Sequence, residues 1–298
     1  MPISRKIMGV SRGGGSKKAI FAYGYSGSAV SMSNLVTSSG VIGSDVTGVG
    51  TARGFLAAAN YGNDKAIFAY GYNGSAVSMS NLVTSSGVIG SDVTGVGTAR
   101  FYLSAASYGT DKAIFAYGYS NTNVSMSNLV TSSGVIGSDV TGVGTARQGP
   151  AAASYGTDKA IFAYGNNGSD VSMSNLVSSS GVIGSDVTGV GTARNYLAAA
   201  NYGNDKAIFA YGYSGGNVSM SNLVTSSGVI GSDVTGVGTA RHVLAAASYG
   251  TDKAIFAYGY SAGNVSMSNL VTSSGVIGSD VTGVGTARQG PAAASYGA

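Results

Sequence analysis

The side chains that could bind a ligand are aromatic and neutral polar residues in two variable connections of a repeated sequence. Aromatic faces beside Asn, Ser and Gln suit stacking on a sugar ring, with hydrogen bonds to its hydroxyl groups. The alternative is that the tyrosines pack between neighbouring repeats. The candidate ligand-binding residues are Tyr25, Tyr72, Tyr119, Asn166, Tyr213 and Tyr260 in the first connection, and Phe55, Phe101, Tyr102, Tyr196 and His242 in the second.

The residue types argue against catalysis. His242 is the only histidine, and the chain has no Cys and no Glu, so a nucleophilic triad or a histidine-based metal site would have to be built within one repeat. All but one of the twelve aspartates recur between repeats, which indicates structural roles. The exception, Asp170, has only Asn166 and Asn167 beside it, too few oxygen ligands to hold calcium well. We therefore expect no enzymatic activity, no cofactor and no metal ion.

The elements that position these residues come from a sixfold internal repeat. The sequence GVIGSDVTGVGTAR at 40–53 recurs unchanged in every repeat, and KAIFAYG returns every 47 residues. The chain therefore divides into a basic N-terminal arm, 1–17, and an array of six repeats, 18–298. The copies of KAIFAYG begin at Lys18, Lys65, Lys112, Lys159, Lys206 and Lys253.

Composition and turn signals predict an all-β fold. Charged residues make up only 9% of the chain and glycine contributes 49 residues, so surface helices are disfavoured. Each repeat contains four short segments separated by Gly-rich or Ser-rich turns, and the continuous apolar run of the second predicts a strand covered on both faces. In the order of one repeat these segments are LAAASYG (244–250 in one copy), KAIFAYGY (18–25), VSMSNLVT (30–37) and GVIGSDVTGV (40–49).

Four short strands per repeat, six times over, predict a six-bladed β-propeller with four antiparallel strands per blade. The rival architecture is a solenoid, which seldom needs 47 residues per rung and normally has atypical capping repeats. The array begins at a second strand and ends after a first strand, so one blade must combine both chain ends. We expect the C-terminal strand, 291–297, to join the N-terminal strands that start at Lys18 and so close the ring.

Sequence variation is concentrated on one predicted face. In an antiparallel meander, the connection from second to third strand and the connection from one blade to the next lie at the same end of the strands. These two connections vary, whereas the SSG turn and the YGTD or YGND turn at the opposite end hardly change. One-sided variation favours a recognition surface on a rigid scaffold. The alternative is that the constant face is tightly turned and tolerates little change.

The basic arm is predicted to mediate assembly. The net charge of +4 comes from the arm, because lysines and arginines balance aspartates in the rest of the chain. The arm could bind an acidic surface, dock on a neighbouring subunit or be a disordered leader, and its lack of aromatics argues against nucleic acid as a partner. We favour docking on another copy or another structural subunit, through Ile3, Arg5, Lys6, Ile7 and Arg12.

The repeat resembles a kelch repeat. The order TAR, small-residue strand, turn, KAIFAYGY and NVSMSNLV is similar to that family, with Tyr-Gly at 23–24 in place of its double glycine, although the kelch Trp and Glu are absent. Such nearly identical propeller repeats are also similar to those of bacteriophage virion and tail-associated proteins.

The resemblance implies a non-enzymatic structural or binding protein in a virion or other extracellular assembly. A lectin that binds cell-surface glycan through the variable face is the alternative, and an enzyme is a second one. The chain shows no signal peptide and no apolar run of membrane-spanning length, so we expect synthesis in the cytoplasm and no membrane insertion.

Overall fold

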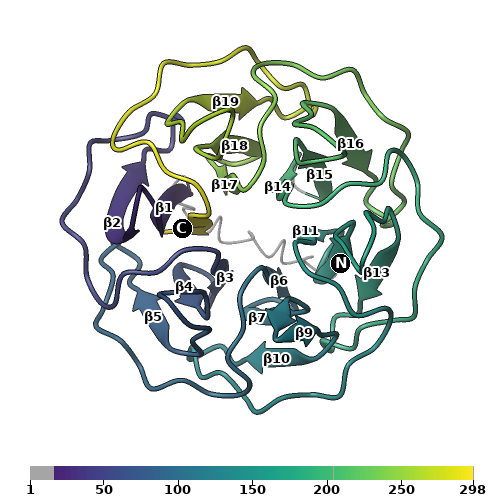
Figure 1. Cartoon of the computed structure of the whole chain (residues 1–298), viewed down its shortest axis with the longest axis horizontal. Helices are drawn as coiled ribbons and strands as arrows, with labels where there is room; N and C mark the ends of the chain where they lie inside the picture. Colours follow the sequence, from purple (N-terminus) through teal and green to yellow (C-terminus); the bar gives the residue numbers. More distant parts are fainter. Residues whose placement is uncertain (1–16, 204, 298) are drawn as a thin grey trace, which may run out of the picture.

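A computed structural model describes residues 17–203 and 205–297, and within these ranges the chain forms strands and no helix. The strands form six three-stranded antiparallel sheets around a central axis (Figure 1). The inner strands are β20 (Ala292–Tyr296), β3 (Ala57–Tyr61), β6 (Ser104–Tyr108), β11 (Ala151–Tyr155), β14 (Ala198–Tyr202) and β17 (Ala245–Tyr249). The middle strands are β1 (Lys18–Tyr25), β4 (Lys65–Ala69), β7 (Lys112–Ala116), β12 (Lys159–Ala163), β15 (Lys206–Ala210) and β18 (Lys253–Ala257). The outer strands are β2 (Ala29–Val36), β5 (Ser80–Val83), β10 (Ser127–Val130), β13 (Ser174–Val177), β16 (Ser221–Val224) and β19 (Ser268–Val271).

The middle strands are covered on both faces, as their apolar runs predict. Ala66, Ile67 and Phe68 of β4 are completely buried between neighbouring sheets. Alanines on the inner strands allow the sheets to converge at the axis, and larger side chains fill the wider space farther out: the ring of Phe115 packs 5.5 Å from that of Tyr70 in the preceding sheet. An apolar cluster of this kind lies between each sheet and the next. The core is therefore divided into six equivalent layers of side chains between β-sheets.

The structure shows three strands per sheet where the sequence predicts four. The segment 40–49 lies outside β2 and is held at isolated bridges, Val36 with Ile42 and Ser33 with Val46. Regular pairing is lost between these points because Asp45 turns toward the neighbouring sheet, where it accepts a hydrogen bond of 2.6 Å from the hydroxyl of Thr286. The fourth element is therefore a bridged outer segment and not a regular strand.

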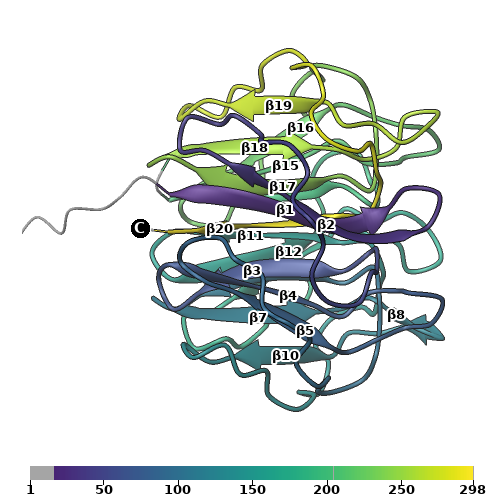
Figure 2. The ribbon, with the colours of Figure 1, turned by 90° about the vertical axis from the view of Figure 1, so that its left-hand side faces the viewer.

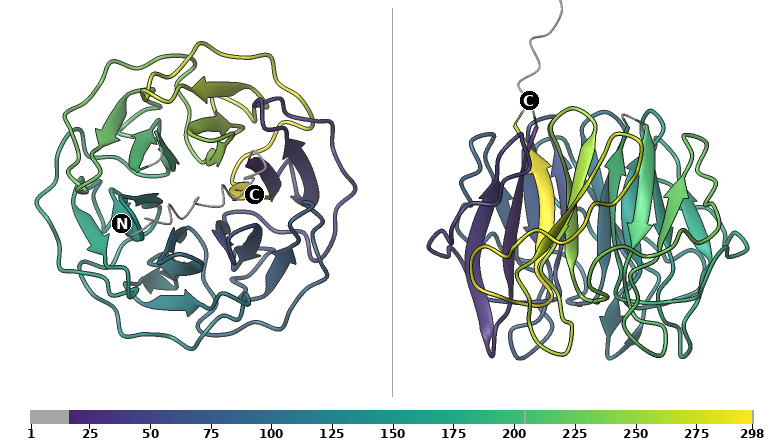
Figure 3. Two further views of the ribbon diagram at one scale, coloured as in Figure 1. Left: turned by 180° about the vertical axis from the view of Figure 1, so that it is seen from behind. Right: turned by 90° about the horizontal axis from the view of Figure 1, so that it is seen from above.

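The C-terminal strand joins the N-terminal strands, as predicted. β20 pairs with β1 in antiparallel register from Lys18 opposite Tyr296 to Ala22 opposite Ala292. Each connection between sheets contains a variable triplet, such as Gly54-Phe55-Leu56. The backbone N–H of its middle residue donates a hydrogen bond of 2.7–3.0 Å to the carbonyl of the middle residue in the preceding triplet. Six such bonds form one closed cycle at the axis (the axial cycle) and join all six sheets. The members of the axial cycle are Phe55, Tyr102, Gly149, Tyr196, Val243 and Gly290. Figures 2 and 3 show the resulting short cylinder, with the C-terminus at one end.

Six buried arginines fasten neighbouring sheets. Arg100 is completely buried, and its guanidinium carbon lies 4.3 Å from the centroid of the Tyr70 ring in the preceding sheet. In the following sheet it donates to Asn128 Oδ1 at 2.6 Å and to the carbonyl of Tyr117 at 3.0 Å. Each arginine therefore links two sheets by a stacked cation and by hydrogen bonds. The equivalents are Arg53, Arg147, Arg194, Arg241 and Arg288.

Aspartates on the outer segments form a second set of hydrogen bonds between neighbouring repeats. Their lowered pKa values predict that the folded protein is less stable in acid. Burial raises the pKa of Asp139, but hydrogen bonds from Thr98 and Asn128 outweigh this effect and hold the pKa below its ordinary value of 3.8. The other five copies behave alike. A pKa lowered by folding stabilises the protein above the unfolded value, and this stabilisation is lost as the pH falls through the folded value.

We therefore expect the urea midpoint to fall as the pH drops below about 4. Asp139→Asn should lower the midpoint at neutral pH, and its difference from the unmodified protein should shrink in acid. A midpoint that stays constant down to this pH would contradict the assignment.

Candidate functional site: an aromatic rim at one end of the ring

The two variable connections lie together at the end of the cylinder opposite the C-terminus, as predicted. Backbone bridges join them in every repeat, for example Gly54 with Tyr72 and Phe101 with Tyr119. Figure 2 shows this end at the β8 label, opposite the C-terminus; β8 (Tyr119–Ser120) and β9 (Thr122–Asn123) form a small hairpin there. The remaining bridges are Gln148 with Asn166, Asn195 with Tyr213, His242 with Tyr260, and Gln289 with Tyr25.

The ten predicted aromatic residues form one connected network, the aromatic rim. Tyr102 is its centre, with ring centroids 4.8 Å from Phe55, 4.9 Å from Phe101 and 4.7 Å from Tyr196. Phe101 extends the network outward, and Tyr196 extends it toward His242. The other contacts are Tyr25 with Phe55, Tyr72 and Tyr119 with Phe101, and Tyr213 and Tyr260 with His242.

The rim side chains are neither core residues nor fully exposed. Tyr213 is 39% exposed and the other rings are half-buried against one another. The rings therefore pack on one another and still present faces to solvent. Truncating Tyr102 or Tyr196 should lower stability, so these two residues are not neutral probes of binding.

Three of the aromatic residues surround the end of the axis. Phe55, Tyr102 and Tyr196 have left-handed φ values of 57°, 53° and 52°, an uncommon conformation held by the axial cycle. Gly149 occupies the equivalent position between Tyr102 and Tyr196, and a Cβ there would lie 2.7 Å from Tyr196 Cδ1. Glycine therefore makes room for the tyrosine ring to lie over the backbone.

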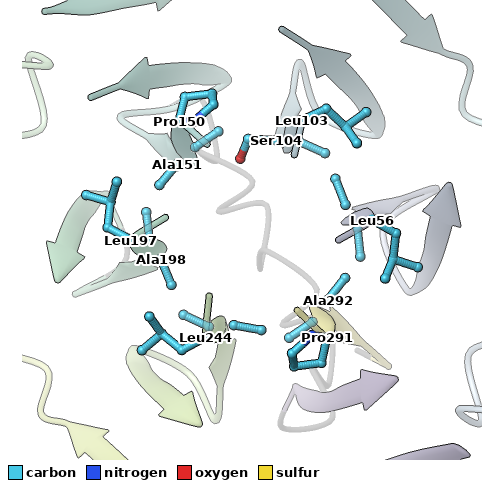
Figure 4. Close-up of a pocket in the computed structure, with 18 residues that line it drawn as sticks. Leu56, Leu103, Ser104, Pro150, Ala151, Leu197, Ala198, Leu244, Pro291 and Ala292 are labelled. Atoms are coloured by element: carbon cyan, nitrogen blue, oxygen red, sulfur yellow. The ribbon is translucent and has the colours of Figure 1, made fainter. Parts of the chain in front are cut away.

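A narrow cavity runs along the axis below these rings. Figure 4 shows it ringed by the leucines and prolines that end each variable triplet, with small residues of the inner strands below. This section has a volume of about 110 Å³, and two further sections of about 50 Å³ and 70 Å³ share lining residues with it. Each is smaller than the roughly 300–1,000 Å³ that is typical of a small-molecule site. The ring consists of Leu56, Leu103, Pro150, Leu197, Leu244 and Pro291.

Polar side chains of the two variable connections form hydrogen bonds with one another beside the aromatic rim. Asp170 Oδ1 accepts hydrogen bonds from Asn166 Nδ2 at 3.0 Å and from Asn195 Nδ2 at 2.8 Å. His242 Nδ1 lies 2.7 Å from Asn217 Oδ1, and burial lowers the pKa of this histidine. Amide donors around Asp170 make it a hydrogen-bonded turn residue, and no group of three His or Asp side chains in the described ranges could hold a metal ion.

The titration of Tyr196 reflects its crowded position. Burial raises its pKa, and the nearby hydroxyl of Tyr102 and charge of Asp170 act in the same direction. Burial likewise raises the pKa of Tyr102. Both phenols remain protonated near neutral pH and can donate hydrogen bonds.

A pairing between residues 25 apart was missed in the sequence. The last position of the first connection and the first position of the next connection are matched in chemistry, as in Asn217 with His242 and Asp170 with Asn195. Ala76 and Phe101 occupy the same two positions on the apolar side. Among the described residues, these two of the six pairs are hydrogen-bonded, whereas Asn123 and Asn264 donate instead to the backbone carbonyls of Asn166 and Tyr25. The signal was present in the sequence as joint variation at a fixed spacing.

Several expectations remain to be set against known proteins and against the structure. No protein-family model and no curated protein matches the chain, so the resemblance to kelch and phage repeats is carried by its residues alone. The described residues include no helix of a length and apolarity that would cross a membrane. The predicted assembly residues Ile3, Arg5, Lys6, Ile7 and Arg12 lie outside the described residues.

Proposed function

We propose that the chain is a non-enzymatic six-bladed β-propeller that binds carbohydrate at its aromatic rim, with the bridged outer segment as the fourth element of each blade. The observation that carries this proposal is the single network of ten aromatic rings, which comes from the variable connections and is only half-buried. Aromatic faces stack on the apolar faces of sugar rings, and the adjoining Asn, Gln and Ser side chains match hydroxyl groups.

The charge of the rim favours a neutral glycan. Apart from tyrosines, Asp170 and His242 are the only ionisable side chains in the two variable connections. Asp170 already accepts hydrogen bonds from the side-chain amides of Asn166 and Asn195. All six buried arginines are enclosed beneath the rim and do not reach its surface. Repeated but non-identical sites at one end of the ring would each bind weakly and gain affinity on a repetitive polymer.

Substituting Tyr213 should test this function with little disturbance of the fold. Tyr213 is the most exposed ring of the network, and Tyr213→Ala is expected to weaken retention on a neutral glycan array by roughly threefold to tenfold, while the unfolding midpoint changes little. Thr110→Ala on the opposite face is the matched control. No retention of the unmodified protein on any neutral glycan would reject the proposal.

A second candidate function is structural, as one subunit of a virion or other assembly outside the cell. The observation that favours it is a constant perimeter: the outer segment repeats without change, and its Val41 and Val46 are 61% and 46% exposed. Exposed apolar belts of this kind mark contacts between protein surfaces.

Electron microscopy of the full-length chain beside a variant lacking residues 1–16 should separate the routes to assembly. Lys17 is kept because its carbonyl accepts a hydrogen bond from Gly250. Ordered arrays of the full-length protein alone would support docking through the arm to other copies, and arrays of both proteins would support the perimeter. Single discs in both preparations would reject the structural candidate.

A further inference from the structure

Two rim loops carry the same Asn-Gly-Ser sequence, Asn73-Gly74-Ser75 and Asn167-Gly168-Ser169, and both are exposed. An Asn-Gly bond can rearrange without an enzyme: the backbone nitrogen of glycine loses its proton and attacks Cγ of asparagine, and the side-chain amide leaves as ammonia. The cyclic imide then takes up one water and opens at either carbonyl, giving aspartate or isoaspartate. The reaction needs a glycine nitrogen and an asparagine side chain that are free to approach each other.

The structure treats the two loops differently. Gly168 N donates to Asn166 Oδ1 at 3.0 Å, and Asn167 Oδ1 accepts a hydrogen bond of 3.4 Å from Ser169 N. The attacking nitrogen of that loop is therefore engaged, and the asparagine side chain is restrained.

In the other loop Tyr72 stands where Asn166 does and offers no oxygen to the glycine nitrogen. Within the described ranges, neither Gly74 N nor the Asn73 side chain makes a hydrogen bond. The backbones are otherwise alike, since Gly74 and Gly168 have φ values of 112° and 119° and both face open space.

We propose that Asn73 is a site of spontaneous conversion to aspartate or isoaspartate, and that Asn166 protects the equivalent Asn167 by holding the attacking nitrogen. Conversion places a negative charge at an exposed loop tip of a rim that otherwise contains one carboxylate, Asp170. The modified and unmodified protein would therefore present different rim charges. This inference does not depend on whether the rim binds carbohydrate.

The test is to incubate the full chain in mildly alkaline buffer and follow both sites in the same sample by tandem mass spectrometry, which localises replacement of an amide by an acid. Asn73 is expected to convert roughly threefold to tenfold faster than Asn167, since a hydrogen bond must be broken before Gly168 N can attack. In the chain unfolded by urea, the two rates should become equal. Equal rates in the folded protein, or faster loss of Asn167, would overturn the proposal.

Exchanging the neighbouring residue tests the cause. Asn166→Tyr should raise the rate at Asn167 toward that of Asn73, and Tyr72→Asn should slow Asn73. Tyr72→Asn also removes a ring contact with Phe101. The variant Asn166→Ala removes the acceptor from the other loop without introducing a new ring. Unchanged rates at Asn167 in both Asn166 variants would show that Asn166 is not the protecting residue.

Discussion

Deletion of residues 291–298 is expected to abolish cooperative folding of the chain. The deletion removes β20, leaves the edge of β1 unpaired, and takes Ala292, Ala294 and Tyr296 out of the apolar cluster between the first and second sheets. It also removes a bond between Gly297 N and the carbonyl of Asp64. The loss should approach the whole folding stability of a domain, on the order of 5–15 kcal/mol. Urea unfolding followed by circular dichroism measures it.

A peptide spanning residues 289–298 provides the control for this deletion. Added to the truncated chain, it should bind along β1 and restore a sigmoidal unfolding curve whose midpoint rises with peptide concentration. A peptide of the same composition in scrambled order should restore nothing. A truncated chain that unfolds at the original midpoint would show that ring closure does not contribute to stability.

Arg100→Ala should be among the most destabilising single substitutions. The change leaves Asn128 Oδ1 and the Tyr117 carbonyl without their donor in a buried interface and removes the cation from the Tyr70 ring. Removal of one member of a buried charged network typically costs about 3–5 kcal/mol. Urea unfolding at neutral pH measures the difference in the free energy of unfolding.

Two further variants separate the charge of Arg100 from its shape. Arg100 also donates to the carbonyl of Thr98 at 3.1 Å. Arg100→Lys keeps the charge but cannot reach all three acceptors in one plane, so it should recover only part of the loss. Lys112→Ala, at an exposed position on a middle strand of the same sheet, should change stability by about 0.5 kcal/mol or less. A similar small effect for Arg100→Ala would contradict the bridging role.

The sequence predicts the gross order of the structure because local patterns determine it. The apolar run at 65–69 is long enough for a strand buried on both faces, and the positions of the chain ends require β20 to pair with β1. The shared face of the variable connections follows from antiparallel order alone. The side-chain contacts between repeats cannot be predicted in the same way. Arg53 has one equivalent tyrosine before it, Tyr23, and one after it, Tyr70, and only the packing of the sheets selects Tyr23 for stacking.

One misjudged feature, and one that the sequence analysis did not address, depend on contacts between sheets. GVIGSDVTGV at 40–49 has the alternation of a strand, but the hydrogen bonds of Asp45 to a neighbouring sheet interrupt its pairing with β2. At the rim, the aromatic residues are correctly placed by the sequence, but their left-handed backbone at Phe55, Tyr102 and Tyr196 is imposed by the axial cycle. Neither effect can be read from a single repeat.

The closing strand β20 has nearly the same sequence as the five other inner strands. A sheet that lacks its inner strand therefore accepts the C-terminal strand of a second molecule as readily as its own, and only the high local concentration of the attached end favours closure within one chain. Refolding at high protein concentration should accordingly produce domain-swapped chains of molecules, each contributing its last strand to the next, in competition with single rings.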